Sequence, residues 1–298
     1  MKIACLNILM LTMLIKSASV FSAPITFNTA LPVAKGEYLA RLQYIVNQSG
    51  KDQSQLERDR STRTTATVLG YGVNSKLALF GVLPVHSNSL TTNTNNIHNE
   101  QKATGLGDTT LFARYTVLQR NQKGQSFRLA PFAGIKAPTG EDDRRDASGV
   151  LPPSAQLGTG SWDPLFGIIS TYQTLDYQID AQLGYQLNTE ANNYEAGDIA
   201  RLDGSLQYRF WPGTLSGRVP GFLYGVIETN LIHQQSDKLN AVTNKNSGGN
   251  RLFISPGIQY VTRRWIIETA LQIPVIQNLN GTGLENDYIA RISGRFNF

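Results

Sequence analysis

The sequence predicts an all-β fold, a transmembrane antiparallel up-and-down β-barrel of about 12 strands. Three observations lead to this expectation. Apolar and polar residues alternate along most of the chain, the alternating segments are about ten residues long, and their connections alternate between short and long.

The alternation is clearest over 177–188. One face of this segment would carry Tyr177, Ile179, Ala181, Leu183, Tyr185 and Leu187, and the other Gln178, Asp180, Gln182, Gly184, Gln186 and Asn188. Successive side chains of a strand point to opposite faces, whereas a helix would mix the two sets around its axis. The same alternation recurs over 198–211 and 287–298, so we expect strands there too.

About twelve such segments can be identified, each of roughly ten residues. They lie near 37–47, 62–72, 75–86, 107–118, 127–137, 163–174, 177–188, 198–211, 221–232, 250–261, 264–275 and 287–298. Ten residues at about 3.4 Å each, tilted by about 45°, rise roughly 24 Å, which matches the apolar band of an outer-membrane barrel. Strands of soluble sandwiches are usually nearer five or six residues, so segment length favours a membrane barrel.

The connections form two classes. The short ones are 72–75, 120–126, 175–176, 212–220 and 262–263, and the long polar ones are 48–61, 87–106, 138–162, 189–197, 233–249 and 277–286. Short turns at one end and long loops at the other are typical of outer-membrane barrels, and an even strand number places both termini in the periplasm. A soluble barrel would share the periodicity but would have a dry interior.

Charged residues fall on the polar face of the predicted strands. The candidate lumen-lining residues are Arg114, Arg128, Lys136, Asp180, Arg201, Asp203, Arg209, Glu228, Arg251, Glu268, Arg291 and Arg295. An Arg or Lys facing lipid at mid-depth would cost about 2–4 kcal/mol, so this face must be wet or ion-paired. Two interpretations stay open: a polar channel lining, or a salt-bridge network that fills a narrow barrel.

The first residues have the layout of a secretory signal peptide. A basic start is followed by an apolar run over 3–15 and a small, polar stretch that ends with Val20 and Ser22 in place for cleavage. We therefore expect a signal peptide over 1–22 and a barrel over 23–298, with cleavage after Ser19 as the alternative. Cys5 is the only cysteine, so the mature chain would contain no thiol.

Composition argues against several functions. The formal net charge of +5 is too mild to predict nucleic-acid binding. The mean hydropathy of −0.23 argues against a helical membrane protein, but not against a barrel, in which half of each strand can be polar. The three histidines lack metal-ligand spacing, and His86 and Ser87 would point to opposite faces of a strand. We expect no catalytic residues, no metal, no cofactor and no enzymatic activity.

Several glycine-containing motifs carry a family resemblance. They are Gly105-Leu-Gly-Asp108, Lys136-Ala-Pro-Thr-Gly140, Leu157-Gly-Thr-Gly-Ser-Trp-Asp-Pro164 and Tyr71-Gly-Val-Asn-Ser-Lys-Leu77, whose glycines suit tight turns at strand ends. Together they resemble the "MetA-pathway of phenol degradation" family, in order over about 62–211 and more loosely to the C-terminus. The resemblance implies an outer-membrane barrel labelled a transporter. It carries over no catalytic residue, and the charged loop 140–154 departs from the family pattern.

The last strand ends in a candidate membrane-insertion signal formed by Phe296 and Phe298. Closure of this strand against 37–47 would remove an exposed apolar edge. We therefore expect a monomer that is exported, inserted by the barrel-assembly machinery and surrounded by outer-membrane lipid. Its expected function is passive or facilitated diffusion of small solutes, aromatic or hydrophobic by resemblance alone. The alternatives are a plugged structural or surface-interaction barrel and, third, an outer-membrane enzyme.

Overall fold

The computed structural model describes residues 22–94, 97–147, 149–213 and 221–298. The predicted signal peptide, 1–22, falls outside these residues except for Ser22, and most of the predicted short connection 212–220 does too. No helix in the described part of the chain is long and apolar enough to cross a membrane.

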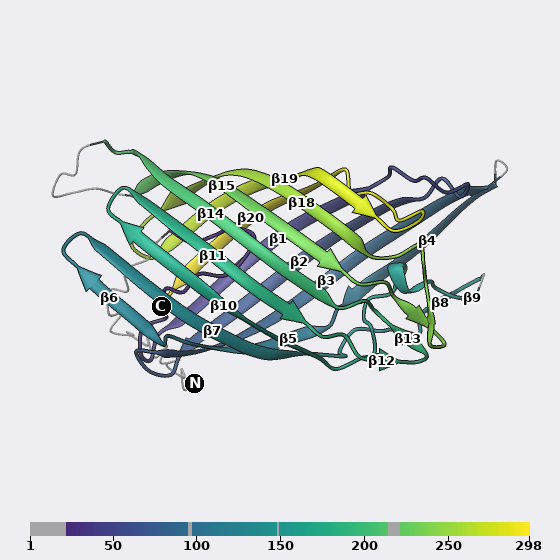
Figure 1. Cartoon of the computed structure of the whole chain (residues 1–298), viewed down its shortest axis with the longest axis horizontal. Coiled ribbons are helices and arrows are strands. Elements are labelled where there is room, and N and C mark those ends of the chain that lie inside the picture. Colours follow the sequence, from purple (N-terminus) through teal and green to yellow (C-terminus); the bar gives the residue numbers. More distant parts are fainter. Residues whose placement is uncertain (1–21, 95–96, 148, 214–220) are drawn as a thin grey trace, which may run out of the picture.

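The described strands form a closed, antiparallel barrel with twelve strand positions, as predicted (Figure 1). Its first five positions are β1 (Tyr38–Ser49), β2 (Asp59–Gly72), β3 (Leu77–Thr94), the consecutive strands β4 (Ile97–Leu106), β5 (Thr109–Tyr115) and β6 (Leu118–Gln122), and β7 (Gln125–Ala137). The other seven are β10 (Asp163–Thr174), β11 (Tyr177–Gln186), β14 (Ile199–Trp211), β15 (Phe222–Gln234), β18 (Gly249–Val261), β19 (Trp265–Leu279) and β20 (Tyr288–Asn297).

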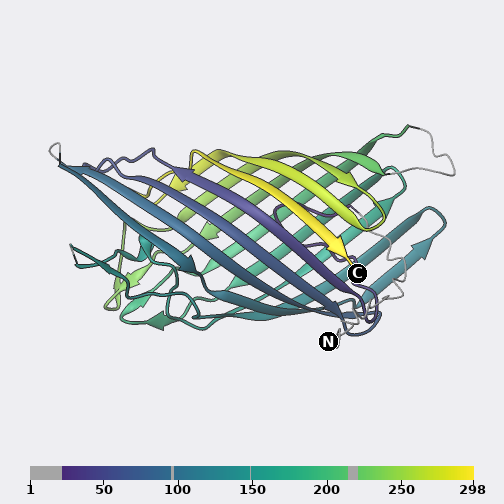
Figure 2. The same ribbon diagram turned by 180° about the vertical axis from the view of Figure 1, so that it is seen from behind.

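The barrel closes between its first and last strands. β1 and β20 pair from Leu39↔Asn297 to Gln48↔Tyr288, and the main chains of Tyr38 and Phe298 exchange hydrogen bonds of 2.7 and 3.0 Å beyond them. The predicted closing pair is therefore confirmed. Figure 2 shows β20 (yellow) lying beside β1 (purple) along the barrel wall.

The expectation of a loop over 87–106 is wrong. β3 continues to Thr94 and pairs with β4 in a two-stranded ribbon, with Val85 opposite Leu106 and Thr94 opposite Ile97. The ribbon is rich in Ser, Thr and Asn because it extends past the end of the barrel, where both faces of a strand can be polar. This composition resembles that of a loop, which explains the error.

The other long connections contain small elements of their own. β8 (Arg145–Asp146), β9 (Gly149–Val150) and the 3₁₀ turn η1 (Pro153–Ala155) lie in 138–162. β12 (Glu190–Ala191), β13 (Tyr194–Glu195), β16 (Lys238–Leu239) and β17 (Val242–Thr243) form one four-stranded sheet that joins the connections after β11 and β15. Connection 138–162 packs against the ribbon, where Leu151, Ala155 and Leu157 contact Leu90 and Ala103.

Candidate functional site

A stretch that precedes the first strand lies inside the barrel. Residues 22–37, which we call the interior segment, run among the inner faces of the strands near the end of the barrel where the short turns lie (Figures 1 and 2). Ile25 and Ala30 are 1% and 0% exposed. Ile25 packs on Val226 and Ala270, and Ala30 packs on Ala130 and Ile169. The barrel interior is therefore partly filled by its own chain.

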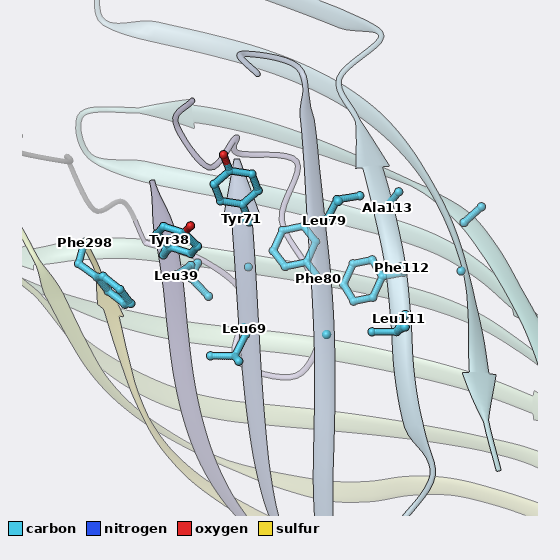
Figure 3. Close-up of a pocket in the computed structure, with 14 residues that line it drawn as sticks. Tyr38, Leu39, Leu69, Tyr71, Leu79, Phe80, Leu111, Phe112, Ala113 and Phe298 are labelled. Atoms are coloured by element: carbon cyan, nitrogen blue, oxygen red, sulfur yellow. The ribbon is translucent and has the colours of Figure 1, made fainter. Parts of the chain in front are cut away.

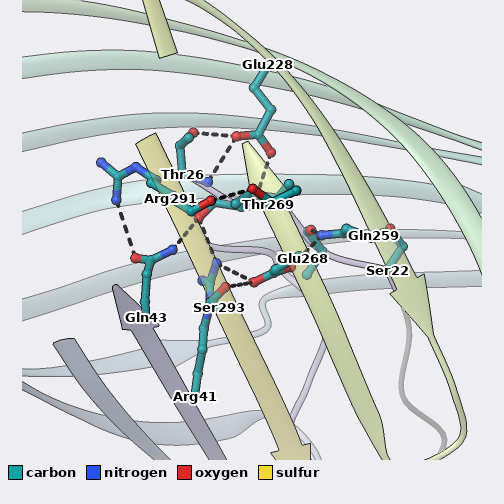
Figure 4. Close-up of polar contacts among 12 residues, drawn as sticks. Ser22, Thr26, Arg41, Gln43, Glu228, Gln259, Glu268, Thr269, Arg291 and Ser293 are labelled. Atoms are coloured by element: carbon teal, nitrogen blue, oxygen red, sulfur yellow. Dashed lines mark hydrogen bonds and ion pairs between the residues drawn. The ribbon is translucent and has the colours of Figure 1, made fainter. Parts of the chain in front are cut away.

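The carboxylate of Glu228 on β15 holds the middle of this segment (Figure 4). It accepts hydrogen bonds from the backbone N–H groups of Ile25 and Thr26 at 2.7 and 2.9 Å, and from the Thr26 hydroxyl at 2.5 Å. Asn230, one inward position further along β15, donates to the same hydroxyl at 2.9 Å. One carboxylate thus satisfies backbone donors that have left water, and this offsets the cost of burying them.

A second set of contacts holds the segment four residues further on. Thr29 donates to Asp180 at 3.0 Å, and the Ala30 N–H donates to Thr171 at 2.8 Å. Arg114 on β5 donates to the carbonyl oxygens of Thr29 and Leu31, the latter at 2.5 Å. Donors and acceptors of the segment therefore have partners on strands from both sides of the barrel.

Arg41 joins the segment to a cluster of polar residues on β19 and β20. It forms an ion pair of 2.6 Å with Glu268 and donates to the Ile25 carbonyl at 2.7 Å. The Ser293 hydroxyl donates to the same Glu268 oxygen, Oε1, at 2.5 Å. The Glu268 side chain is 3% exposed, so its charge depends on these partners rather than on water.

The two halves of the inner surface differ in chemistry. The inner faces of β11, β14, β15, β18, β19 and β20, which we call the polar wall, carry Gln178, Asp180, Gln182, Asp203, Ser205, Gln207, Glu228, Asn230, Ser255, Gln259, Glu268, Gln272 and Ser293, all buried. The inner faces of β2, β3, β5 and β7, the apolar wall, carry Ala66, Val68, Ala78, Phe80, Val82, Phe112, Ala130 and Phe132, together with the charged residues Arg114, Arg128 and Lys136.

The apolar wall is built around three aromatic rings. Phe80 stacks on Phe112 with ring centroids 4.8 Å apart, and Phe132 meets Phe112 edge-on at 6.3 Å. Gly134 lies opposite Phe112 in the pairing of β5 with β7. A Cβ at Gly134 would lie 2.4 Å from the Cβ of Phe112, so glycine makes room for the ring.

An interior cavity of about 240 Å³ separates part of the interior segment from the apolar wall. Its apolar side is formed by Val68, Val82, Phe112, Phe132 and Leu165, and its polar side by Arg41, Gln43, Gln182 and Arg201, with Ile25, Thr26, Phe27 and Asn28 between them. The cavity is therefore amphipathic: it can contact the body of a small apolar molecule on one side and its polar groups on the other.

All twelve candidate lumen-lining residues lie on strands of the barrel, and six of them are buried: Arg114, Asp180, Asp203, Arg209, Glu228 and Glu268. The structure brings some of them together: Arg201 contacts Asp203 at 3.1 Å, and Glu228 and Glu268 belong to the clusters that hold the interior segment. Others are separated along the barrel. Arg209 pairs with Asp176 in a short turn, whereas Arg251 contacts Gln234 near the opposite end. Arg128, Arg291 and Arg295 also line the interior.

Sequence reasoning missed the interior segment and the apolar wall. The sequence of the interior segment has no periodicity that would predict its place inside the barrel. The apolar wall does leave a signal, because Leu77–Pro84 and much of 127–135 are apolar at consecutive positions instead of alternate ones. A continuous apolar run indicates a strand that is apolar on both faces.

The glycine-containing motifs anchor connection 138–162 at the end of the barrel. Lys136 pairs with Asp163 at 2.5 Å, and Asp108 accepts hydrogen bonds from the N–H groups of Gly140 and Thr159 at 3.0 and 2.9 Å. A Cβ at Gly158 would lie 2.5 Å from the carbonyl oxygen of Gly140. The motifs thus fix a close crossing of two backbone segments, consistent with the structural role expected for their glycines.

His86 and Ser87 lie on opposite faces of β3. His86 Nδ1 is 2.8 Å from the Thr64 hydroxyl on the inner face, and the Ser87 hydroxyl is 3.1 Å from that of Thr104. Among the described residues, no group of three or more His, Cys, Asp or Glu could hold a metal ion.

A large apolar hollow lies on the outer face of the barrel (Figure 3). Its volume is about 700 Å³, and small residues at Gly81, Ala113 and Ala133 form part of its floor. The outward-facing side chains around it include Tyr38, Leu69, Tyr71, Leu79, Leu111 and Phe298. The lining also includes Phe80 and Phe112, and Phe112 lines the cavity beside the interior segment as well, so its ring lies between the two spaces.

Two solved structures were compared with the barrel, and the first shows the same fold. An outer membrane channel from Pseudomonas putida F1 matches with a TM-score of 0.70 and 12% identity, over 93% of this chain and 100% of that one. The transport unit of the autotransporter AIDA-I from Escherichia coli matches with a TM-score of 0.49 and 10% identity, over 95% of each chain. The first comparison establishes likeness to an outer-membrane barrel in fold alone.

At the level of sequence, no curated protein matches the chain. A family model does match, over residues 40–270, and this range contains all four motifs on which the predicted resemblance rests. The chain therefore belongs to the family described as "Putative MetA-pathway of phenol degradation".

Proposed function

We propose that the protein is an outer-membrane channel for passive or facilitated diffusion of small solutes. The observation that carries this proposal is the amphipathic cavity of about 240 Å³ inside a closed barrel. The interior segment narrows the lumen, so a solute has to pass beside it or wait for it to move. Residues 25–28 line the cavity, which supports a passage between this part of the segment and the apolar wall.

The chemistry of the cavity favours solutes with an apolar, ring-sized body and at least one polar group. Phe112 and Phe132 offer aromatic surfaces on one side, and Gln43 and Gln182 offer amide groups on the other. A sugar would leave hydroxyl groups without partners against the apolar wall, which costs free energy. The family description, phenol degradation, agrees with this solute class.

In this proposal the short turns and both termini face the periplasm, and the long connections face outward, as in other outer-membrane barrels. The protein is exported, inserted by the barrel-assembly machinery and functions as a monomer. The barrel itself supplies the passage, and no step of the proposed function needs a cofactor or a catalytic residue.

Single-channel recording in planar bilayers tests the channel. The wild type should give discrete steps, and Arg201→Gln and Asp203→Asn should shift ion selectivity in opposite directions, because both side chains face the interior as a pair. Gln48→Leu at the rim of the barrel is a matched control, since it contacts Asp59 and not the cavity.

The interior segment also favours a second candidate, a plugged structural barrel that binds partners through its long connections. The two candidates differ in one result. If neither the wild type nor a variant without residues 23–33 gives conductance steps, the plugged barrel is correct and the channel is not.

A further inference from the structure

Two glutamine side chains meet at the first described residue of the interior segment. The Ser22 hydroxyl lies 2.9 Å from Gln207 Oε1 and 2.7 Å from Gln259 Oε1, and Ser22 is 1% exposed. Each contact requires the hydroxyl as the donor, but a hydroxyl carries a single hydrogen. One of the two buried acceptors is therefore left without a donor from this group.

The orientation of both glutamines is fixed by their other partners. Gln207 Nε2 donates to Asp180 at 3.1 Å, and Gln259 Nε2 donates to Glu268 at 2.7 Å (Figure 4 shows the second contact). Turning either amide over would place its oxygen against a carboxylate. The two amide oxygens must therefore converge on this point, which makes it a site for a group with more than one hydrogen to donate.

We propose that this site holds the α-ammonium group of Ala23 after the chain is cut between Ser22 and Ala23. Hydrolysis by signal peptidase adds the hydroxyl of water to the Ser22 carbonyl and its hydrogen to the Ala23 nitrogen, which then binds a proton. The resulting ammonium has three hydrogens for the two amide oxygens. The Ala23 carbonyl already accepts a hydrogen bond from Gln259, so the residue stays in place when Ser22 leaves.

Electrostatics support an ammonium at this point. The carboxylates of Asp180 and Glu268 lie directly behind the two glutamines, and their hydrogen bonds polarise the amides so that the oxygens become better acceptors. Cleavage at this position agrees with two separate observations. Val20 and Ser22 stand at the positions that a signal peptidase requires, and the two amide acceptors converge beside Ser22 inside the barrel. The free amino terminus becomes the terminal anchor of the interior segment.

This inference does not depend on transport. A barrel that conducts nothing can still hold its amino terminus, and a conducting barrel can start at another residue. The first test is the intact mass of the protein purified from outer membranes. The expected mass is that of 23–298. A mass that retains residues 20–22, from cleavage after Ser19, would overturn the proposal.

The second test is the reactivity of the amino group. An amine-selective label applied to the folded protein in detergent should modify the Ala23 amine more than tenfold more slowly than the exposed side chains of Lys76 and Lys123, as read from the labelled peptides. Equal rates would contradict a buried anchor. Heating the protein until it unfolds should remove the difference.

Variants locate the anchor. Gln207→Leu and Gln259→Leu should raise the labelling rate at Ala23, whereas Gln182→Leu should not, because Gln182 is also buried on the polar wall but contacts Asp203 instead. Insertion of Gly-Ser between Ser22 and Ala23 keeps every wall residue and moves the terminal amine out of the site. The amine of this variant should therefore react with the label about as fast as the exposed lysine side chains. Unchanged protection in an insertion variant whose intact mass shows that the inserted Gly-Ser is retained would refute the site even if the glutamine variants fail to fold.

Discussion

The polar and apolar walls of the barrel interior contact the interior segment in different ways. The polar wall binds it through directed contacts: Glu228 alone accepts hydrogen bonds from two backbone N–H groups and one hydroxyl. The apolar wall packs against it, with Val33 against Ala78 and Phe80, and its directed contacts come from Arg114 at the end of β5, which donates to the carbonyls of Thr29 and Leu31. Directed contacts fix the position of a chain, whereas an apolar surface leaves neighbouring space free for other molecules. The difference explains why the cavity lies beside the aromatic rings.

The largest expected effect on conductance comes from removing the part of the interior segment that the polar wall binds. Deletion of residues 23–33 should raise single-channel conductance several-fold, because the segment occupies the interior near the short turns. Replacement of the same residues by a Gly-Ser stretch of equal length serves as the control for chain length. Unchanged conductance in both variants would mean that the segment does not limit the passage.

A change at Glu228 tests the polar wall itself. Glu228→Ala leaves the buried N–H groups of Ile25 and Thr26 without their acceptor, which costs about 1–3 kcal/mol for each group. The segment should leave the wall more often, seen as faster and larger conductance fluctuations. Glu228→Gln keeps one acceptor oxygen and should show a smaller change. Equal behaviour of the two variants would argue against the hydrogen bonds as the cause.

A change at Phe112 tests the apolar wall. Phe112→Asn places an amide where the cavity is lined by aromatic and aliphatic side chains, and should lower the flux of a phenol into proteoliposomes while leaving that of a small sugar unchanged or raised. Gln48→Leu, at the rim of the barrel and outside the cavity lining, should not lower phenol flux. Parallel losses for both solutes would indicate a general collapse of the passage.

The smallest expected effect lies outside both walls, in connection 50–58. Burial of Asp52 opposes its ionisation, but hydrogen bonds from Arg58 and Ser54 outweigh this and hold the pKa of Asp52 below its usual value of 3.8. A lowered carboxyl pKa adds stability that is complete above the usual value and is lost as the pH falls through the lowered one. The hydrogen-exchange protection of 50–58, measured relative to the unfolded chain at the same pH, should therefore stay constant above about pH 4 and fall in stronger acid.

Asp52→Asn should abolish that pH dependence, while Asp59→Asn, a neighbouring carboxylate that contacts Gln48, should retain it. Exchange within the barrel strands should be unaffected in both variants. A transition that persists in Asp52→Asn would assign the effect to another group.

Strands with one polar and one apolar face could be predicted from the sequence. In β11, β14 and β20 the outer face carries exposed apolar side chains and the inner face is polar, so the alternation of 177–188 gives both the strand and its inner row. Over 77–84 of β3 and 129–135 of β7 both faces are apolar, and the alternation that would mark Phe80 and Phe132 as inward is lost.

The position of the interior segment could not be predicted because it is set by single contacts from many strands. Ile25, for example, packs against β15 and β19, far from it in the sequence, and no local pattern records these partners. The twelve charged residues could be assigned to a polar face, but not grouped, since pairs such as Arg201 with Asp203 and Arg41 with Glu268 depend on side-chain direction along the wall.

The most direct test of the account is a disulfide between the interior segment and one wall. The described residues contain no cysteine, so two cysteines introduced at Thr26 and Asn230 can report the contact of these residues without competition from other thiols. In the structure, Thr26 Oγ1 and Asn230 Nδ2 are 2.9 Å apart. We predict that Thr26→Cys with Asn230→Cys forms a disulfide in the membrane-inserted protein. Thr26→Cys with Val82→Cys, across the cavity, should stay reduced. Cross-linking to Val82 instead of Asn230 would contradict the placement of the segment on the polar wall.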